Sequence, residues 1–224
     1  MQGGDVVKSG WWWNTSRWAA YQAAYHTVRP EPESYKSSPL ADDHEFGWDA
    51  QREYYELATH LTQVIDLTLP RETLWRNTRD SYHSLIHRGA ETHRPMISGD
   101  WEAYKQLHIE ANGGQPRPDV TYEMQRQWIM DGFGVLIATP KPAAAAYWII
   151  YQDCAYYASG PSIERKVQHA VVWYSLEYFM ATGIRLVELG KIDGETEKEK
   201  AVGFFKSGWG GKSVPYTIAT RRMT

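Results

Sequence analysis

Basic side chains recur every three or four residues in a stretch before residue 90. Four of them fall on one face of a single expected helix, with a fifth beside them: Arg76, Arg79, His83, His87 and Arg88. Such a face could bind a phosphate or pyrophosphate group, because several cationic donors would converge on one anion. It could also be the solvated side of an amphipathic helix. Both interpretations follow from the pattern.

Two of these residues have a spacing used by metal sites. His83 and His87 stand one helical turn apart, so both imidazoles could reach one ion. The residues between them are Ser84, Leu85 and Ile86, and the glutamate of the zinc-protease helix is missing. We therefore expect no metal site here.

A short segment near the end of the chain gathers aromatic rings, one lysine and two glycines. Residues 204–211 read FFKSGWGG, with Lys206 at the centre. Taken alone, this pattern is typical of a lysine at a helix end, followed by a glycine turn and a closing strand. The elements that precede the segment give it a second interpretation.

The composition excludes several classes of protein. The chain has 224 residues and a net charge of -3, so it has no general positive coat, and any contact with tRNA or DNA must be local. Its single cysteine, Cys154, excludes an internal disulfide and a cysteine-based zinc site. The longest apolar stretch, residues 143–151, is too short to span a bilayer. We expect a cytoplasmic protein without a membrane span.

The chain divides into an extension and a main domain. Residues 1–63 form an aromatic-rich extension, in which helices are expected over 13–28 and 46–61. The three tryptophans at 11–13 would form an apolar patch on the domain or on a second subunit, so a homodimer is one expectation.

The main domain, residues 64–224, predicts an α+β fold with a mixed, largely antiparallel sheet flanked by helices. Strands are expected over 63–69, 134–139, 145–152, 154–160, 185–190 and 214–221. Helices are expected over 71–90, 100–112, 119–132, 164–183 and 194–205, with Asp100 capping the second and Gly113 ending it.

The order of elements after residue 100 resembles the GNAT acyltransferase fold. Three local segments resemble its Fem-type branch (FemA, FemB and FemX) and the related CelD-like acyltransferases: RNTRDSYHSLIHRGAETH, ATGIRLVELG and AVGFFKSGWGG. The resemblance covers about residues 64–220. It implies a GNAT-like fold and an enzyme that transfers an acyl or aminoacyl group to an amine.

The resemblance implies a role for the lysine of the FFKSGWGG segment. In the Fem-type family this lysine lies at the active site, which makes Lys206 the candidate for stabilising the oxyanion of acyl transfer. Phe204, Phe205 and Trp209 would wall the acceptor pocket. Tyr157 and Ser159, on the strand that enters the long helix, could orient the acceptor, although tyrosines on a strand are more often packing residues. Gly210 and Gly211 would let the backbone turn close to the substrate.

The residues at the start of the long helix bear on the identity of the acyl donor. Users of acetyl-CoA with this fold carry glycines there, whereas this chain reads GPSIERKVQHAVV. The resemblance therefore implies acyl-CoA or aminoacyl-tRNA as a co-substrate, with no permanently bound cofactor. The candidate donor and anion-binding residues are Arg76, Arg79, Arg88, Arg165, Lys166 and Lys191.

Glu188 is the candidate general base, because it precedes Gly190 at the end of a strand, where loops commonly build sites. It could instead pair with Lys191 or Lys206. The acceptor would be an amine on a sugar, peptide or nucleobase precursor. Alternatives are an enzyme that modifies nucleic acid, and a catalytically silent protein of this fold that binds a glycan or nucleic acid.

Overall fold

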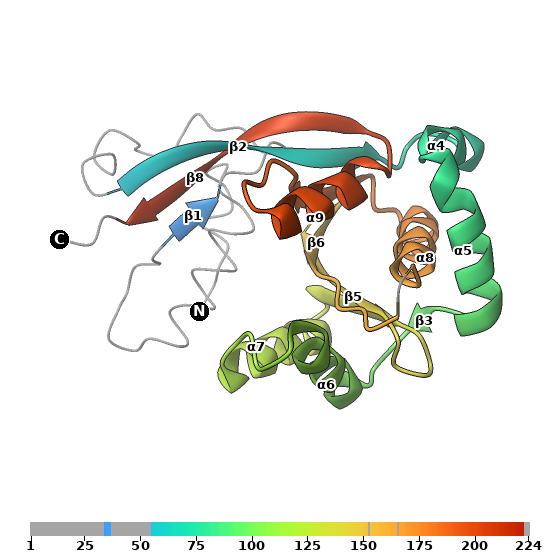
Figure 1. The fold of residues 1–224 in the computed structure, drawn as a ribbon, viewed down its shortest axis with the longest axis horizontal. Helices are drawn as coiled ribbons and strands as arrows, with labels where there is room; N and C mark the ends of the chain where they lie inside the picture. Colours follow the sequence, from blue (N-terminus) through green and yellow to red (C-terminus); the bar gives the residue numbers. More distant parts are fainter. Residues whose placement is uncertain (1–33, 37–54, 152, 165, 222–224) are drawn as a thin grey trace. The chain divides into compact units, whose positions relative to one another are not determined.

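The computed structural model describes residues 34–36, 55–151, 153–164 and 166–221 (Figure 1). The chain forms two compact units: one is Gln63–Lys212, and the other joins Met1–Thr62 to Ser213–Thr224. The helix expected over 13–28 and the tryptophans at 11–13 lie outside the described residues.

The larger unit contains a mixed sheet whose strands follow the order β2-β7-β6-β5-β4-β3. Neighbouring strands from β3 to β6 are antiparallel, whereas β6 and β7 are parallel. This confirms the expected meander and the mixed character of the sheet. The strands are β2 (Tyr55–Asp66), which enters this unit at Gln63, β3 (Met96–Ile97), β4 (Gly134–Ala138), β5 (Ala145–Tyr151), β6 (Cys154–Ser159) and β7 (Leu186–Lys191).

Helices cover both faces of this sheet (Figure 1). Trp148 of β5 packs edge-on against Phe179 of α8, with ring centroids 5.1 Å apart. The neighbouring Tyr147 instead contacts Trp101 of α6, at 5.9 Å. Because successive strand residues point to opposite faces, α8 and α6 lie on opposite sides of the sheet. The helices are α4 (Arg71–Asn77), α5 (Asp80–His93), α6 (Trp101–Asn112), α7 (Asp119–Met130), α8 (Gln168–Ala181) and α9 (Glu197–Ser207).

The smaller unit contains the start of β2 together with β1 (Ser34–Lys36) and β8 (Lys212–Arg221), which pair antiparallel. The helix expected over 46–61 is wrong from Tyr55 onward, where the chain enters β2. The ring of His60 in β2 contacts that of Tyr216 in β8, with centroids 5.9 Å apart. A partner strand distant in sequence thus outweighs the local helical pattern.

The helix expected over 71–90 is two helices. The chain is extended at Thr78 and Arg79, with ψ of 139° and 130°. The break satisfies two groups: Arg79 N donates to Gly208 O (2.8 Å), and the Thr78 hydroxyl donates to Leu74 O (3.0 Å). Because α4 and α5 are separate, the basic side chains do not form one continuous helical stripe.

Helix ends follow the expected capping chemistry. The Asp100 side chain accepts a hydrogen bond from Ala103 N at the start of α6, and Gly113 ends the helix with a φ of 68°. Thr196 and Glu199 form a reciprocal capping box that begins α9. Among the described residues, no helix has the length and apolar content needed to cross a bilayer.

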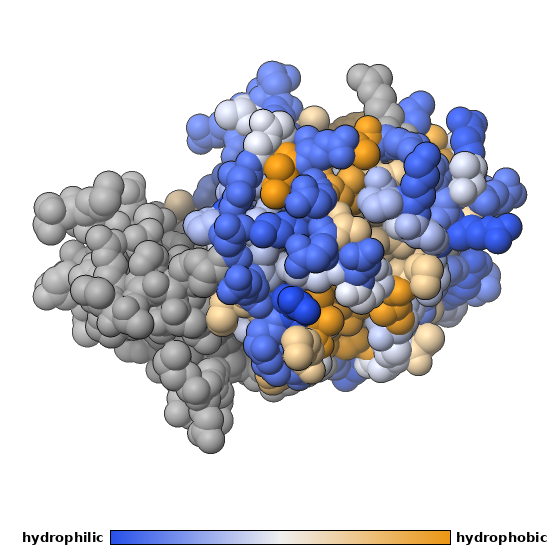
Figure 2. All heavy atoms as spheres, turned by 90° about the horizontal axis from the view of Figure 1, so that it is seen from below, coloured by the Kyte–Doolittle hydropathy of each residue, from blue (hydrophilic) through white to orange (hydrophobic). Residues whose placement is uncertain are grey.

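Figure 2 shows one face of the molecule, where hydrophilic side chains predominate and hydrophobic ones form separate areas. The most exposed large hydrophobic side chains include Met130, at 71%, and Phe204, at 64%. Scattered exposed apolar residues of this kind are normal on protein surfaces.

Helix α9 approaches the backbone after β7 closely. An ideal Cβ at Gly203 would lie 2.0 Å from the carbonyl oxygen of Ile192. Only a residue without a side chain fits there, so Gly203 sets the position of the helix that carries Lys206.

We predict that Gly203→Ala lowers the free energy of unfolding by about 1–3 kcal/mol, because overpacking against a backbone carbonyl costs more than helix propensity returns. Urea unfolding measures this change. Gly99→Ala is the control, since a Cβ there meets nothing within 4 Å, and it should change stability by less than about 0.5 kcal/mol. Equal or greater stability of Gly203→Ala would contradict the packing described.

Candidate functional site

A cavity of about 660 Å³ lies where β6, α6, α8 and α9 meet. Its wall is formed by the end of β6, the connection to α8, the first turn of α8, the end of α6 and one side of α9. Five of the predicted site residues line it: Tyr157, Ser159, Lys166, Phe205 and Lys206. The structure therefore brings three of the expected acceptor residues, Tyr157, Ser159 and Phe205, to one place with the candidate lysine.

The cavity opens beyond the paired part of β6 and β7. The parallel register runs from Cys154↔Leu186 to Tyr156↔Glu188, and β6 continues to Ser159. Because the end of β6 lines the cavity, its backbone can be reached by a ligand beside the sheet.

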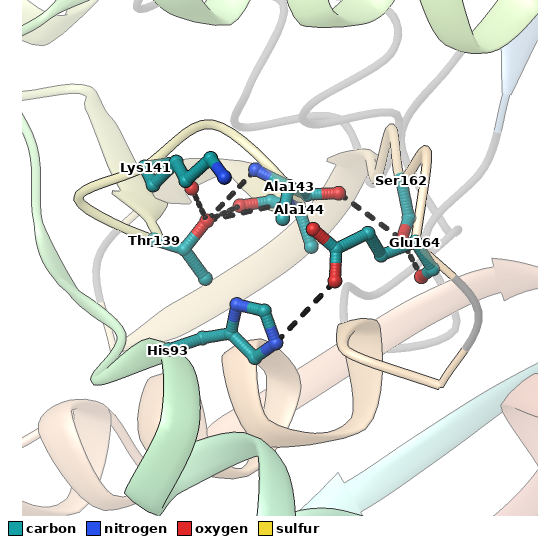
Figure 3. Close-up of polar contacts among 7 residues, drawn as sticks. All are labelled: His93, Thr139, Lys141, Ala143, Ala144, Ser162 and Glu164. Atoms are coloured by element: carbon teal, nitrogen blue, oxygen red, sulfur yellow. Dashed lines mark hydrogen bonds and ion pairs between the residues drawn. The ribbon is translucent and has the colours of Figure 1, made fainter.

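The connection from β6 to α8 is held against β5. Ala145 N donates to Pro161 O and Ile163 N donates to Ala143 O, both at 3.0 Å. The Ser162 hydroxyl donates to Glu164 O at 2.7 Å (Figure 3). These bonds give this wall of the cavity a fixed shape.

The same region is supported from the turn before β5. Figure 3 shows Thr139 Oγ1 accepting from Ala143 N (3.0 Å) and donating to Lys141 O (2.6 Å). It also shows the Glu164 carboxylate beside His93 of α5, at 3.5 Å. The Thr139 hydroxyl thus stabilises the β4–β5 turn, and the cavity wall is hydrogen-bonded to this turn at Ala143.

A buried amide lies at the base of the cavity. Gln168, the first residue of α8, is 8% exposed, and its Nε2 donates to Ala145 O and to the Tyr157 hydroxyl, both at 2.9 Å. Burial raises the pKa of Tyr157, so its hydroxyl stays protonated. An ideal Cβ at Gly160 would lie 1.5 Å from that hydroxyl, so only glycine fits beside it.

Lys206 lies in the last turn of α9, with its ammonium at the end of β7. Its Nζ donates to Lys191 O at 3.1 Å. Gly190 has a φ of 77°, and an ideal Cβ there would lie 3.4 Å from Lys206 Nζ and 3.1 Å from the Tyr156 hydroxyl. A bare backbone at Gly190 thus lets the ammonium reach the end of the strand.

The sequence reasoning missed His169, which lines the cavity one residue after Gln168. Its Nδ1 lies 3.0 Å from Lys166 O, and its ring packs edge-on against Tyr82 and Phe205 at 4.3 Å and 5.1 Å. Burial, followed by the charges of Lys166 and Arg79, lowers the pKa of His169 despite its bond to the carbonyl. A lone histidine in a helix has no local signature, so only the fold reveals this position.

His108 of α6 is a second cavity residue that was missed. It is 6% exposed, and its Nδ1 lies 2.7 Å from the Tyr122 hydroxyl. Burial, with a contribution from Arg117, lowers its pKa to about 4. His108 is therefore neutral near pH 7.

Apart from the arginines and the two glycines, four predicted residues are not among the described residues that line the cavity: Glu188, Lys191, Phe204 and Trp209. Glu188 is fully buried on β7, between Val187 and Leu189 of the main core. Trp209 is also buried in that core, 1% exposed. Lys191 meets the site through its backbone carbonyl, which accepts from Lys206.

The predicted anion-binding arginines are spread over several elements. Arg79 donates to Phe204 O (3.1 Å), and its guanidinium stacks 3.7 Å from the centroid of the Phe204 ring. Arg76 is exposed on α4, while Arg88 lines a separate cavity of about 230 Å³ that also contains Lys166. Arg165 lies outside the described residues. Of this set, only Lys166 lines the main cavity among the residues described.

The paired histidines of α5 flank a tryptophan. His83 stacks on Trp75, with centroids 4.1 Å apart, and His87 lies 5.1 Å from the same ring. Within the part of the chain that the structure describes, no group of three or more His, Cys, Asp or Glu side chains could hold a metal ion.

Gly210 and Gly211 lie close to the backbone of α4 and β2, whereas the sequence predicted that they lie close to the substrate. An ideal Cβ at Gly211 would lie 2.1 Å from Val64 O, and one at Gly210 would lie 2.8 Å from Asn77 O. Both glycines have positive φ angles, and Gly210 O accepts a hydrogen bond from Gln63 Nε2. These glycines fasten the end of α9 to β2 and α4.

No protein-family profile matches the chain, and no curated protein matches it. Solved structures do share its fold. The crystal structure of FemX gives a TM-score of 0.58 at 12% identity, covering 91% of this chain and 76% of that one. The C-terminal domain of a protein described as a lysylphosphatidylglycerol synthetase from Agrobacterium fabrum gives 0.54 at 11%, covering 92% and 72%.

A third structure, L-PGS from Bacillus licheniformis, gives a TM-score of 0.52 at 9% identity, covering 81% of this chain and 66% of that one. Together these likenesses confirm the Fem-type, GNAT-like fold expected from the sequence. Identities of this size establish the fold and leave the activity to be argued from the site.

We predict that His108 makes the protein sensitive to acid. The pKa of His108 is about 6.5 in the unfolded chain and about 4 in the folded protein, so the unfolded chain binds more protons between these two pH values. The free energy of unfolding therefore falls as the pH is lowered from about 6.5 to about 4. His108→Asn, which keeps a partner for Tyr122, should show a smaller decrease in urea unfolding at pH 4.5 relative to pH 7. Part of the decrease should remain, because the pKa of His169 is also lowered. An unchanged pH dependence would contradict the neutral, buried imidazole.

Proposed function

We propose that this protein is an acyltransferase that moves an acyl or aminoacyl group from a phosphate-bearing donor to an amine. The observation that carries the proposal is the cavity that brings Lys206 together with Tyr157 and Ser159. Its support is the combination of this cavity with the fold shared with FemX and with the lysylphosphatidylglycerol synthetase domain.

The charge of the cavity fits an anionic donor. Lys166, Lys198 and Lys206 line it, and among the described lining residues the one carboxylate is that of Glu164. Acyl-CoA and aminoacyl-tRNA share an adenosine, phosphate groups and an activated acyl carbon, so both match this chemistry. Lysine ammonium groups at the rim would bind the phosphates as point charges.

Lys206 would act on the acyl carbonyl. When an amine attacks the acyl carbon, the carbonyl oxygen becomes an anion, and a donor placed within hydrogen-bond distance stabilises it by about 3 kcal/mol. Phe205 lies beside Lys206 on the cavity wall and would exclude water from the charged oxygen. The acceptor amine would lie near Tyr157 and Ser159, where β6 extends beyond its pairing with β7.

The cavity favours a reaction on a small acyl group, and the positions of the arginines do not favour a groove that binds nucleic acid. Arg76 lies on α4, whereas Arg79 precedes α5 and Arg88 lies within it, and Arg79 is engaged with Phe204. A tRNA would then contribute mainly its acylated end. A catalytically silent binding protein would retain donor affinity without transfer, so the measurement below distinguishes it.

We predict that Lys206→Met lowers the rate of transfer about 100- to 1000-fold, the usual loss of one oxyanion donor. The assay follows radiolabelled acetyl-CoA and lysyl-tRNA separately, with glucosamine and a lysyl peptide as acceptors. Lys198→Met is the matched control: it removes another lysine of α9 from the same cavity and should weaken donor binding by less than about tenfold.

Binding is measured in parallel by thermal stabilisation. A donor at a hundred times its dissociation constant stabilises the protein by about 2.7 kcal/mol. Stabilisation by either donor without transfer to any acceptor would support the binding-protein alternative. Equal transfer rates for Lys206→Met and wild type would remove Lys206 from the chemistry.

A further inference from the structure

An imidazole in the cavity has a defined geometry and no role in the chemistry described so far. His169 lies in the first turn of α8 and shares the cavity wall with Phe205 and Lys206. His169 is partly exposed, whereas its neighbours in the chain, Gln168 and Ala170, are buried. Its exposed part lines the cavity.

The hydrogen bond at Nδ1 fixes the tautomer of this imidazole. Lys166 O lies 3.0 Å from Nδ1 and, as a carbonyl, can only accept. Nδ1 must therefore carry the proton, so in the neutral ring Nε2 keeps its lone pair. Lys166 has a φ of 77°, a left-handed conformation that directs its carbonyl back toward the first turn of α8.

Aromatic packing fixes the ring plane as well. Tyr82 of α5 contacts the ring edge-on at 4.3 Å, Phe205 of α9 contacts it at 5.1 Å, and Trp209 lies 6.0 Å away. Rings from α5, from α9 and from the turn after α9 thus hold one imidazole, which is the rigid support that a proton-transfer group requires.

Several charged and titratable groups lie near His169 or share its cavity wall. They are Lys166 before α8, Lys206 on α9, and Arg79 and Tyr82 at the start of α5. Burial and the cationic charges of Lys166 and Arg79 lower the pKa of His169. A neutral base near pH 7 is the form that can accept a proton.

We infer that His169 is the general base of this site, accepting through Nε2 the proton that the acceptor amine loses as it attacks the acyl carbon. The inference rests on the proposed acyl transfer. It gives Glu188 no part in the proton transfer, because that carboxylate is fully buried in β7 and is not among the described residues that line the cavity.

The transfer balances in protons and electrons with the acyl donor, the acceptor amine and His169 alone. The amine nitrogen bonds to the acyl carbon, the C=O π electrons move to the oxygen near Lys206, and Nε2 takes one amine proton. Collapse of the intermediate restores C=O and breaks the bond to the thiolate of CoA or to the ribose oxygen of tRNA. The imidazolium then gives its proton to that leaving group, which returns His169 to its neutral form.

His169→Asn tests the inference, because the asparagine amide can still donate to Lys166 O but has no group to accept the amine proton. With the donor and acceptor that wild type uses among acetyl-CoA, lysyl-tRNA, glucosamine and lysyl peptide, we expect kcat to fall about 100- to 10,000-fold. Donor affinity, measured by thermal stabilisation, should change less than about threefold.

The pH profile provides a second readout. In wild type, kcat/KM should rise with pH in two steps: one with a midpoint below 6.5 as His169 loses its proton, since the pKa of His169 is lowered from that value, and one at higher pH as the acceptor ammonium becomes the free amine. His169→Asn should lack the first step and keep the second. A variant that transfers as fast as wild type, or that keeps the first step, overturns the inference while leaving the proposed function intact.

Nitrogen-15 NMR of the wild-type imidazole tests the geometry without any activity, and so covers the case in which the variant does not fold. At pH 7.5 we expect protonated Nδ1 and unprotonated Nε2; the opposite tautomer overturns the inference. If wild type transfers from neither donor to any acceptor, the proposed function fails, and the assignment of a general base fails with it.

Discussion

The cavity depends on one buried amide. Both N–H groups of Gln168 are used, one on Ala145 O of β5 and one on the Tyr157 hydroxyl of β6. N–H groups taken out of water need acceptors, so the Nε2 of this side chain ties the start of α8 to two strands at once. Gly160 fits against the same hydroxyl because it has no side chain. Loss of the amide would remove both hydrogen bonds that join the start of α8 to β5 and β6 beside the cavity.

The second support of the site is the close packing of α9. Gly203 lets the helix lie on Ile192 O, and Gly210 and Gly211 join its end to α4 and β2. The consequence is that Lys206 and Phe205 face the first turn of α8, where His169 is held by Tyr82 and by its own backbone neighbour Lys166. Glycine contacts distant in sequence thereby decide which polar groups share the cavity.

Local patterns in the sequence predict those parts of the fold that local chemistry decides. The strands β4 to β6 follow from their apolar runs, and the ends of α6 follow from Asp100 and Gly113. The break at Arg79 could not be predicted, because its N–H is satisfied by Gly208 O, far along the chain. The same holds for the site: the resemblance predicts Lys206 and the position at the end of a strand predicts Tyr157, whereas His169 joins the cavity only because α8 and α9 meet.

In the proposed transfer reaction, the activated acyl carbon of a phosphate-bearing donor lies beside Lys206. The most direct test is a crystal structure with unreactive donors: a CoA thioether that keeps the acyl carbonyl, and adenosine carrying lysine through a 3′-amide. We predict that the carbonyl oxygen of one analogue lies within about 3 Å of Lys206 Nζ, inside the cavity. A carbonyl bound outside this cavity, or the failure of both analogues to bind, would contradict the account.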